Sequence, residues 1–83
     1  MSAILRWFND GDVRYRAYFR THGSNAGVRQ LVVASRHGEY ADVVSADCRL
    51  EDFSHSELLA YARRVRIETQ ERADLVAIDA AAD

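Results

Sequence analysis

The clearest pattern in the chain is a strict alternation of apolar and polar side chains between residues 13 and 20. Two sets of residues alternate there, with Val13, Tyr15, Ala17 and Phe19 in one and Arg14, Arg16, Tyr18 and Arg20 in the other. A period of two places successive side chains on opposite faces of an extended chain. The segment therefore predicts a β-strand with one buried face, rich in the aromatic residues that strands favour.

A partner strand is expected over Ala3–Phe8, because the link that follows it contains Asp10-Gly11. Asp-Gly is typical of tight hairpins, since glycine adopts the positive φ that a type I′ turn requires. With Asp10-Gly11 as the two-residue loop, each residue of the first strand faces one of the second. The pairs are Phe8 with Val13, Trp7 with Arg14, Leu5 with Arg16, and Ala3 with Tyr18.

This register sorts the hairpin into two faces. The inward side chains are those of Phe8, Val13, Tyr15, Ala17 and Phe19, and the outward ones those of Leu5, Trp7, Arg14, Arg16, Tyr18 and Arg20. Arg6 also turns inward, where its guanidinium must reach solvent or an acid. A shift of one residue would instead bury Trp7 and Leu5 and expose Arg6. The sequence leaves both registers open, but Arg14, Arg16 and Arg20 stay on the surface in either.

Two further strands are expected. Val28–Ser35 contains Leu31–Ala34, which is apolar on both faces as in a central strand, and Tyr40–Ala46 returns after a second tight turn at His37-Gly38. The pattern thus predicts a four-stranded antiparallel meander over residues 1–46.

A helix is predicted over residues 54–81. Ser54 and Glu57 have the spacing of a capping box, in which each side chain accepts a hydrogen bond from the other residue's backbone N–H. Phe53 before the cap and Leu58 at the fourth helical position form a hydrophobic staple. An apolar stripe then follows one face through Tyr61, Ala62, Val65, Thr69, Ala73, Val76 and Ala80.

The helix is long for this sheet. It would span roughly 42 Å, whereas an eight-residue strand spans about 27 Å. It must overhang the sheet or break near Ile67–Gln70. Ile67 and Ile78 fall opposite the main stripe. They are either tolerated surface residues or a second contact face for a partner chain or a self-dimer.

Strands followed by one helix give an α+β fold, with the helix packed on one face of the sheet. The 83 residues are enough for one domain, 1–83. No apolar run approaches a membrane span, and no signal peptide is visible. The single cysteine, Cys48, excludes an intrachain disulfide and favours a cytoplasmic setting.

The residue inventory disfavours catalysis. All eleven basic residues are arginine, which removes P-loop, Schiff-base and pyridoxal-phosphate lysines. Cys48 and the scattered His22, His37 and His55 do not form a zinc signature, so neither a metal nor a cofactor is expected. Two enzyme alternatives remain, a Cys48 nucleophile and a small ribonuclease built from Arg, His and Glu.

Charge is divided along the chain. Residues 1–38 hold six arginines against Asp10 and Asp12, a balance of +4, and residues 39–83 hold five against eleven acids, a balance of −6. Either the two halves form internal salt bridges, or the field steers a charged partner.

The outward hairpin face is the candidate partner-binding site, with Trp7, Arg14, Arg16, Tyr18 and Arg20 as its residues. Tryptophan, tyrosine and arginine are enriched in binding hot spots, and Trp7 over Arg14 would form a cation–π pair. A protein complex is the expected partner. The alternative is a small dimeric nucleic-acid-binding protein that uses the arginines for phosphates and Tyr18 for stacking.

The approach to the helix, Leu50–Leu58, reads LEDFSHSEL. With the strands before it, this junction resembles that of small phage-encoded anti-CRISPR proteins of the type I inhibitor kind, which have an acidic-Phe approach and a Ser/Thr-to-Glu cap. The resemblance implies a non-enzymatic inhibitor that binds and occludes a CRISPR surveillance complex. It assigns no binding residue, because the strands do not align.

Overall fold

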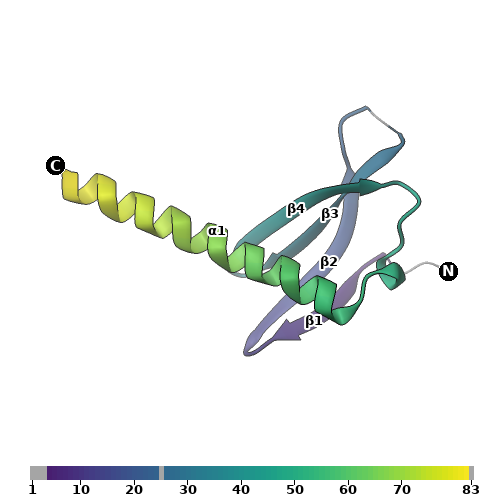
Figure 1. Cartoon of the computed structure of the whole chain (residues 1–83), viewed down its shortest axis with the longest axis horizontal. Helices are drawn as coiled ribbons and strands as arrows, with labels where there is room; N and C mark the ends of the chain where they lie inside the picture. Colours follow the sequence, from purple (N-terminus) through teal and green to yellow (C-terminus); the bar gives the residue numbers. More distant parts are fainter. Residues whose placement is uncertain (1–3, 25, 83) are drawn as a thin grey trace.

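The computed structural model describes residues 4–24 and 26–82, and for residues 71–82 the backbone alone. Four antiparallel strands form one sheet in the order β1-β2-β3-β4, with bounds β1 Arg6–Asp10, β2 Val13–Thr21, β3 Val28–Ser35 and β4 Gly38–Ser45. A 3-10 turn, η1 (Leu50–Asp52), leads to a single helix, α1 (His55–Ala82), which lies across one face of the sheet (Figure 1). The predicted α+β meander with a C-terminal helix is confirmed.

The bounds of the elements differ from the predicted ones mainly at the first and last strands. β3 is as predicted, whereas β1 begins at Arg6 rather than Ala3, and β4 covers Gly38–Ser45 rather than Tyr40–Ala46. Ala3 and its predicted pairing with Tyr18 lie outside the described residues.

The predicted pairing of the first hairpin is wrong. Trp7 lies opposite Arg16, and Phe8 opposite Tyr15, because the two-residue loop is Gly11-Asp12 rather than Asp10-Gly11. Gly11 has φ 61°, and no described residue other than glycine has positive φ. That combination fits a type II′ turn, which needs glycine only at its first central position, whereas type I′ needs positive φ at both.

The predicted faces nevertheless hold, because the register differs from the predicted one by two residues. An even shift changes partners but leaves each side chain on its own side of the sheet. Phe8, Tyr15 and Ala17 are buried beneath the helix, while Trp7 is 49% exposed. The alternative register, with Trp7 in the core and Arg6 outside, is therefore excluded.

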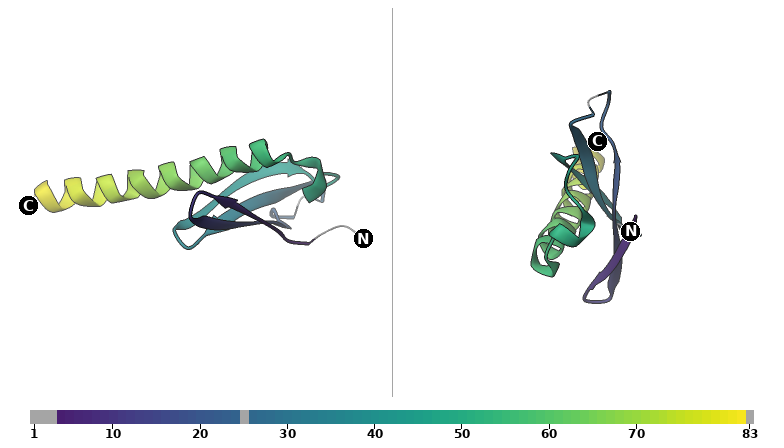
Figure 2. Two further views of the ribbon diagram at one scale, coloured as in Figure 1. Left: turned by 90° about the horizontal axis from the view of Figure 1, so that it is seen from below. Right: turned by 90° about the vertical axis from the view of Figure 1, so that its right-hand side faces the viewer.

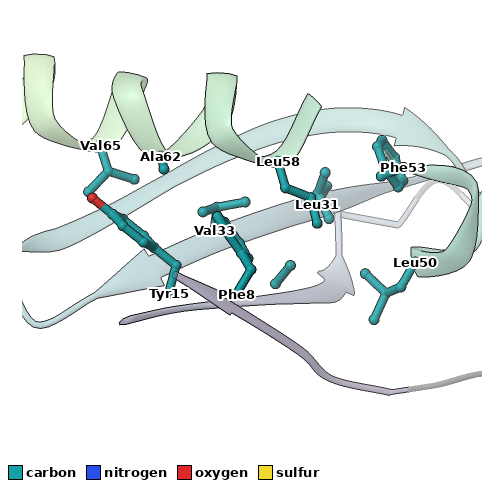
Figure 3. Close-up of a cluster of buried hydrophobic side chains, with 10 residues drawn as sticks. Phe8, Tyr15, Leu31, Val33, Leu50, Phe53, Leu58, Ala62 and Val65 are labelled. Atoms are coloured by element: carbon teal, nitrogen blue, oxygen red, sulfur yellow. The ribbon is translucent and has the colours of Figure 1, made fainter. Parts of the chain in front are cut away.

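The core lies between α1 and the inward face of the sheet, where Figure 3 shows Leu58, Ala62 and Val65 facing the strands. The cluster of buried side chains comprises Phe8, Tyr15, Ala17, Leu31, Val33, Leu50, Phe53, Leu58, Ala62 and Val65. Phe53 and Leu58 belong to it together, as the hydrophobic staple predicts.

Arg6 explains how the connection before the helix is held. Its side chain points inward, as the pattern predicted. The hydrogen bonds of its guanidinium go to backbone carbonyls and not to an acid. Its Nη1 donates to the backbone carbonyls of Leu50 and Phe53, at 3.0 and 2.7 Å. One cation thus ties the first residue of η1 and the residue that follows it to the first strand, and charged donors make the stronger hydrogen bonds.

The helix is continuous and overhangs the sheet, which decides between the two predicted alternatives. Near the end of the sheet the Thr69 hydroxyl lies 3.0 Å from the carbonyl oxygen of His37 in the β3–β4 turn. Beyond this point the helix projects past the strands (Figure 1). No helix among the described residues has the length and apolar character to cross a membrane.

Two inward tyrosines differ in how their hydroxyls are satisfied. Tyr61 on α1 donates to a carboxylate oxygen of Asp42 on β4 at 2.8 Å. Burial and this hydrogen bond raise the pKa of Tyr61 to about 12. The Tyr15 hydroxyl is buried and has no hydrogen-bond partner in the described part of the chain, and burial raises its pKa too.

The helix start offers the first test. The Glu57 N–H donates to the Ser54 hydroxyl at 3.1 Å, and the Ser54 N–H donates to the Glu57 carboxylate at 3.4 Å. Ser54→Ala should lower the free energy of unfolding by about 1 kcal/mol in urea titration, because a helical N–H loses its acceptor. The control Ser56→Ala, at an exposed position two residues on, should change it by less than about 0.5 kcal/mol. Equal effects of the two variants would contradict the capping role.

The tyrosine pair offers a second test. Tyr61→Phe should destabilise the fold by about 1 kcal/mol, since it leaves the Asp42 carboxylate without its donor. Tyr15→Phe should leave stability unchanged or raise it, because it removes a buried hydroxyl that bonds to nothing. Thermal unfolding of both variants at neutral pH measures the difference, and the reverse order would refute this assignment.

Candidate protein-binding surface

One face of the sheet carries no helix from the described part of the chain, and we call it the open sheet face. Figure 2 shows α1 on one side of the strands only. The strand pairings align the outward side chains of all four strands. These outward residues are Trp7 and Asn9 on β1; Arg14, Arg16, Tyr18 and Arg20 on β2; Val28, Gln30, Val32 and Ala34 on β3; and Glu39, Ala41, Val43 and Ser45 on β4.

The centre of the open sheet face is buried although no element covers it. Val32 is 0% and Ala34 2% exposed, and neither belongs to the core cluster beneath the helix. Tyr18 and Arg16, which lie opposite them on β2, are half-buried. The long side chains of neighbouring strands therefore supply the cover, with their stems against the valine and alanine and their polar ends in water.

An ion pair crosses this centre. Arg20 on β2 donates from Nη1 to Glu39 on β4 at 3.2 Å, and from Nε to Gln30 on β3 at 2.7 Å. Because β3 lies between β2 and β4, the bridge passes over the outward side of β3. Both charged side chains are nearly half exposed, so the pair contributes little to stability. Its effect is to neutralise Arg20 and to hold a polar cover over Val32.

At the β1 edge, Trp7 and Arg14 form the predicted cation–π pair. The Arg14 guanidinium carbon lies 4.5 Å from the centre of the Trp7 ring. In the observed register the two residues are diagonal neighbours, not direct partners, and diagonal pairs remain within reach of long side chains. The contact places a guanidinium over one side of the exposed Trp7 ring.

The arginines of the open sheet face are therefore not equivalent. Arg20 is paired with an acid of the same chain, whereas neither Arg14 nor Arg16 has an acidic partner among the described residues. The uncompensated positive charge gathers at the β1–β2 side of the face, next to Trp7. On the β4 side, Val43 is an exposed apolar side chain, at 49%.

Two ion pairs in the described part of the chain join residues 1–38 to residues 39–83. Arg20–Glu39 has the signs that the charge division predicts, whereas the pair between the helix and the sheet has the opposite signs. Arg66 on α1 pairs with Asp10 at the first hairpin, at 3.0 Å. A helical arginine thus meets a sheet carboxylate, although the sequence balance led us to expect the reverse. This pair lies on the helix side and leaves the open sheet face unaffected.

The other candidate residues are dispersed. Cys48 is a half-buried free thiol that packs against the core, and its carbonyl accepts a hydrogen bond from Arg29. His22 follows β2, His37 lies in the β3–β4 turn, and His55 begins α1. No group of three or more metal-ligating side chains occurs in the described ranges. Ile67 is exposed, and the side chain of Ile78 lies outside the described residues.

The sequence interpretation found the β1 and β2 residues of this surface and missed those of β3 and β4. Glu39, Ala41 and Val43 alternate with Tyr40, Asp42 and Val44, so the period-two signal was present. The ion pair from β2 to β4 had no local signal, because its residues are 19 positions apart. Comparisons with family models, with curated proteins and with solved structures found no match for this chain.

The single tryptophan makes the exposure of the open sheet face directly measurable. Trp7 fluorescence should show the red-shifted emission of a hydrated indole, because nearly half of the residue is exposed. Iodide should quench it more strongly than caesium does, since Arg14 and Arg16 attract anions to the ring. Arg14→Gln should reduce the preference for iodide. Blue-shifted emission that neither ion quenches would show that Trp7 is buried.

Proposed function

We propose that this chain is a non-enzymatic binding protein that docks a protein partner through the open sheet face. The observation that carries the proposal is the exposed Trp7, held in place by Arg14 on a face that no element of the fold covers. Aromatic and arginine side chains with restricted motion lose little entropy on binding, so they anchor interfaces.

The composition of the face favours a protein over a nucleic acid. Arg20 is neutralised by Glu39, which leaves Arg14 and Arg16 as the uncompensated cations of the face. Arg14 also covers one side of the Trp7 ring, and that side is closed to a stacked base. An exposed Val43 offers nothing to a phosphate backbone but suits an apolar protein surface. The fitting partner presents apolar side chains with carboxylates beside them.

The junction resemblance supports a narrower proposal, in which the partner is a CRISPR surveillance complex and binding occludes it. The predicted cap and staple at this junction are both present. They support the comparison of local structure, while the identity of the partner rests on the resemblance alone.

A single set of variants tests both levels of the proposal. The first variant combines Trp7→Ala, Arg14→Glu and Arg16→Glu, and the matched control is Arg63→Glu, which reverses an exposed arginine on α1. Binding to a purified type I surveillance complex is measured by biolayer interferometry. The parent and the control should bind equally, and the triple variant at least tenfold more weakly, because hot-spot side chains contribute about 2 kcal/mol or more.

Two outcomes would count against the proposal. No binding of the parent to the complex would refute the narrower version, and equal binding by the triple variant would refute the use of this face. Duplex DNA and RNA are assayed beside the complex at two salt concentrations. Tight parent binding to either of them, falling steeply with salt, would establish the nucleic-acid alternative instead.

A further inference from the structure

The two edges of the sheet differ in how they are protected. Natural proteins shield an edge with short strands, prolines, lysines or bulges. β1 has only five residues, whereas β4 has eight and pairs with β3 in an unbroken register. β4 contains neither proline nor lysine, and no strand of the described chain pairs with its outer side.

The backbone groups that point out from this edge can be identified. Ser35 pairs with Gly38 across a two-residue turn, and the Ala46 N–H donates to the Gly27 carbonyl at 3.1 Å at the other end of the same ladder. Hydrogen-bonded pairs alternate along an antiparallel ladder, so the even-numbered residues of β4 bond to β3. The N–H and C=O groups of Glu39, Ala41, Val43 and Ser45 therefore point outward, and the Ser45 carbonyl already accepts a hydrogen bond from the Cys48 N–H at 3.1 Å.

We infer that β4 pairs with β4 of a second copy of this chain, antiparallel and centred on Ala41. In this register Ala41 of one copy faces Ala41 of the other, and Glu39 of each copy faces Val43 of the other. The N–H and C=O groups of Glu39, Ala41 and Val43 in each copy then all find partners, in six hydrogen bonds. The two sheets become one sheet of eight strands.

The side chains of β4 suit this register. The two-fold axis passes between the two small Ala41 residues, and no like charges face each other, because Glu39 lies beside Val43 of the second copy. The Glu39 carboxylate also pairs with Arg20 of its own sheet at 3.2 Å. Its negative charge is therefore neutralised within each copy and does not oppose pairing at the edge. On the helix side Tyr40 faces Asp42. A register centred on Asp42 would instead set two carboxylates opposite each other.

This pairing leaves the open sheet face uncovered and joins the open faces of the two copies into one surface of twice the area. The two-fold axis through the shared edge keeps both helices on one side of the sheet and both open faces on the other. The inference does not rest on the proposed function, since it uses the edge and not the face.

Site-specific disulfide formation tests the register. In a Cys48→Ser background, Ala41→Cys places two thiols directly opposite, with Cα atoms about 5.5 Å apart, which is within disulfide range. The matched control Val43→Cys lies on the same edge and face, but its copies would be about 13 Å apart. Mild oxidation should double the 9.4 kDa mass for the Ala41 variant and not for the control. Faster cross-linking of the control would overturn this register.

Native mass measurement tests the association without any label. The parent should have twice the 9.4 kDa mass in sedimentation equilibrium, and Ala41→Pro should return it to the monomer mass. Proline removes an N–H that bonds outward and not to β3, so circular dichroism should show an unchanged fold. A parent that stays monomeric at millimolar concentration would overturn the inference, whatever the variants do.

Discussion

The structure depends on a central strand that is apolar on both sides and has only one helix to cover it. Leu31 and Val33 pack beneath α1, while Val32 and Ala34 point the other way and are equally buried. Burial of apolar side chains is the main favourable contribution to folding, so both sides of β3 must be screened from water. On the open side this is done by side chains of β2 and β4, among them Tyr18 and the Arg20–Glu39 pair. The surface that stabilises the sheet is thus also the surface for which we propose partner binding.

Much of the fold could be predicted from the sequence because its signals are local. The alternation in Val13–Arg20 gave the faces of the sheet, and Ser54 with Glu57 gave the start of the helix to within a residue. The first hairpin shows the limit of such reasoning. Gly11 was rightly placed in the turn, but the sequence did not show that only one positive φ was needed, so the pairing was wrong by two residues while the faces were right.

Only the residues of the candidate site that lie in the first hairpin were predicted from the sequence. Trp7, Arg14 and Tyr18 follow from the hairpin alone, and the structure brings them to one face. Arg20 is neutralised and Arg14 and Arg16 are not, because β4, two strands from β2 in the sheet, brings Glu39 to Arg20 alone. This arrangement is a property of the assembled sheet. The inward Arg6 is similar, because its acceptors are carbonyls more than forty positions along the chain.

Methyl NMR with a soluble paramagnetic agent tests the central claim most directly, since two valines of the same face have opposite environments. The Val43 methyl resonances should broaden strongly and those of Val32 should not, because Val43 is 49% and Val32 0% exposed. Glu39→Gln, which weakens the bridge over β3, should increase the broadening of Val32. Strong broadening of Val32 in the parent would contradict a face that its own side chains keep dry.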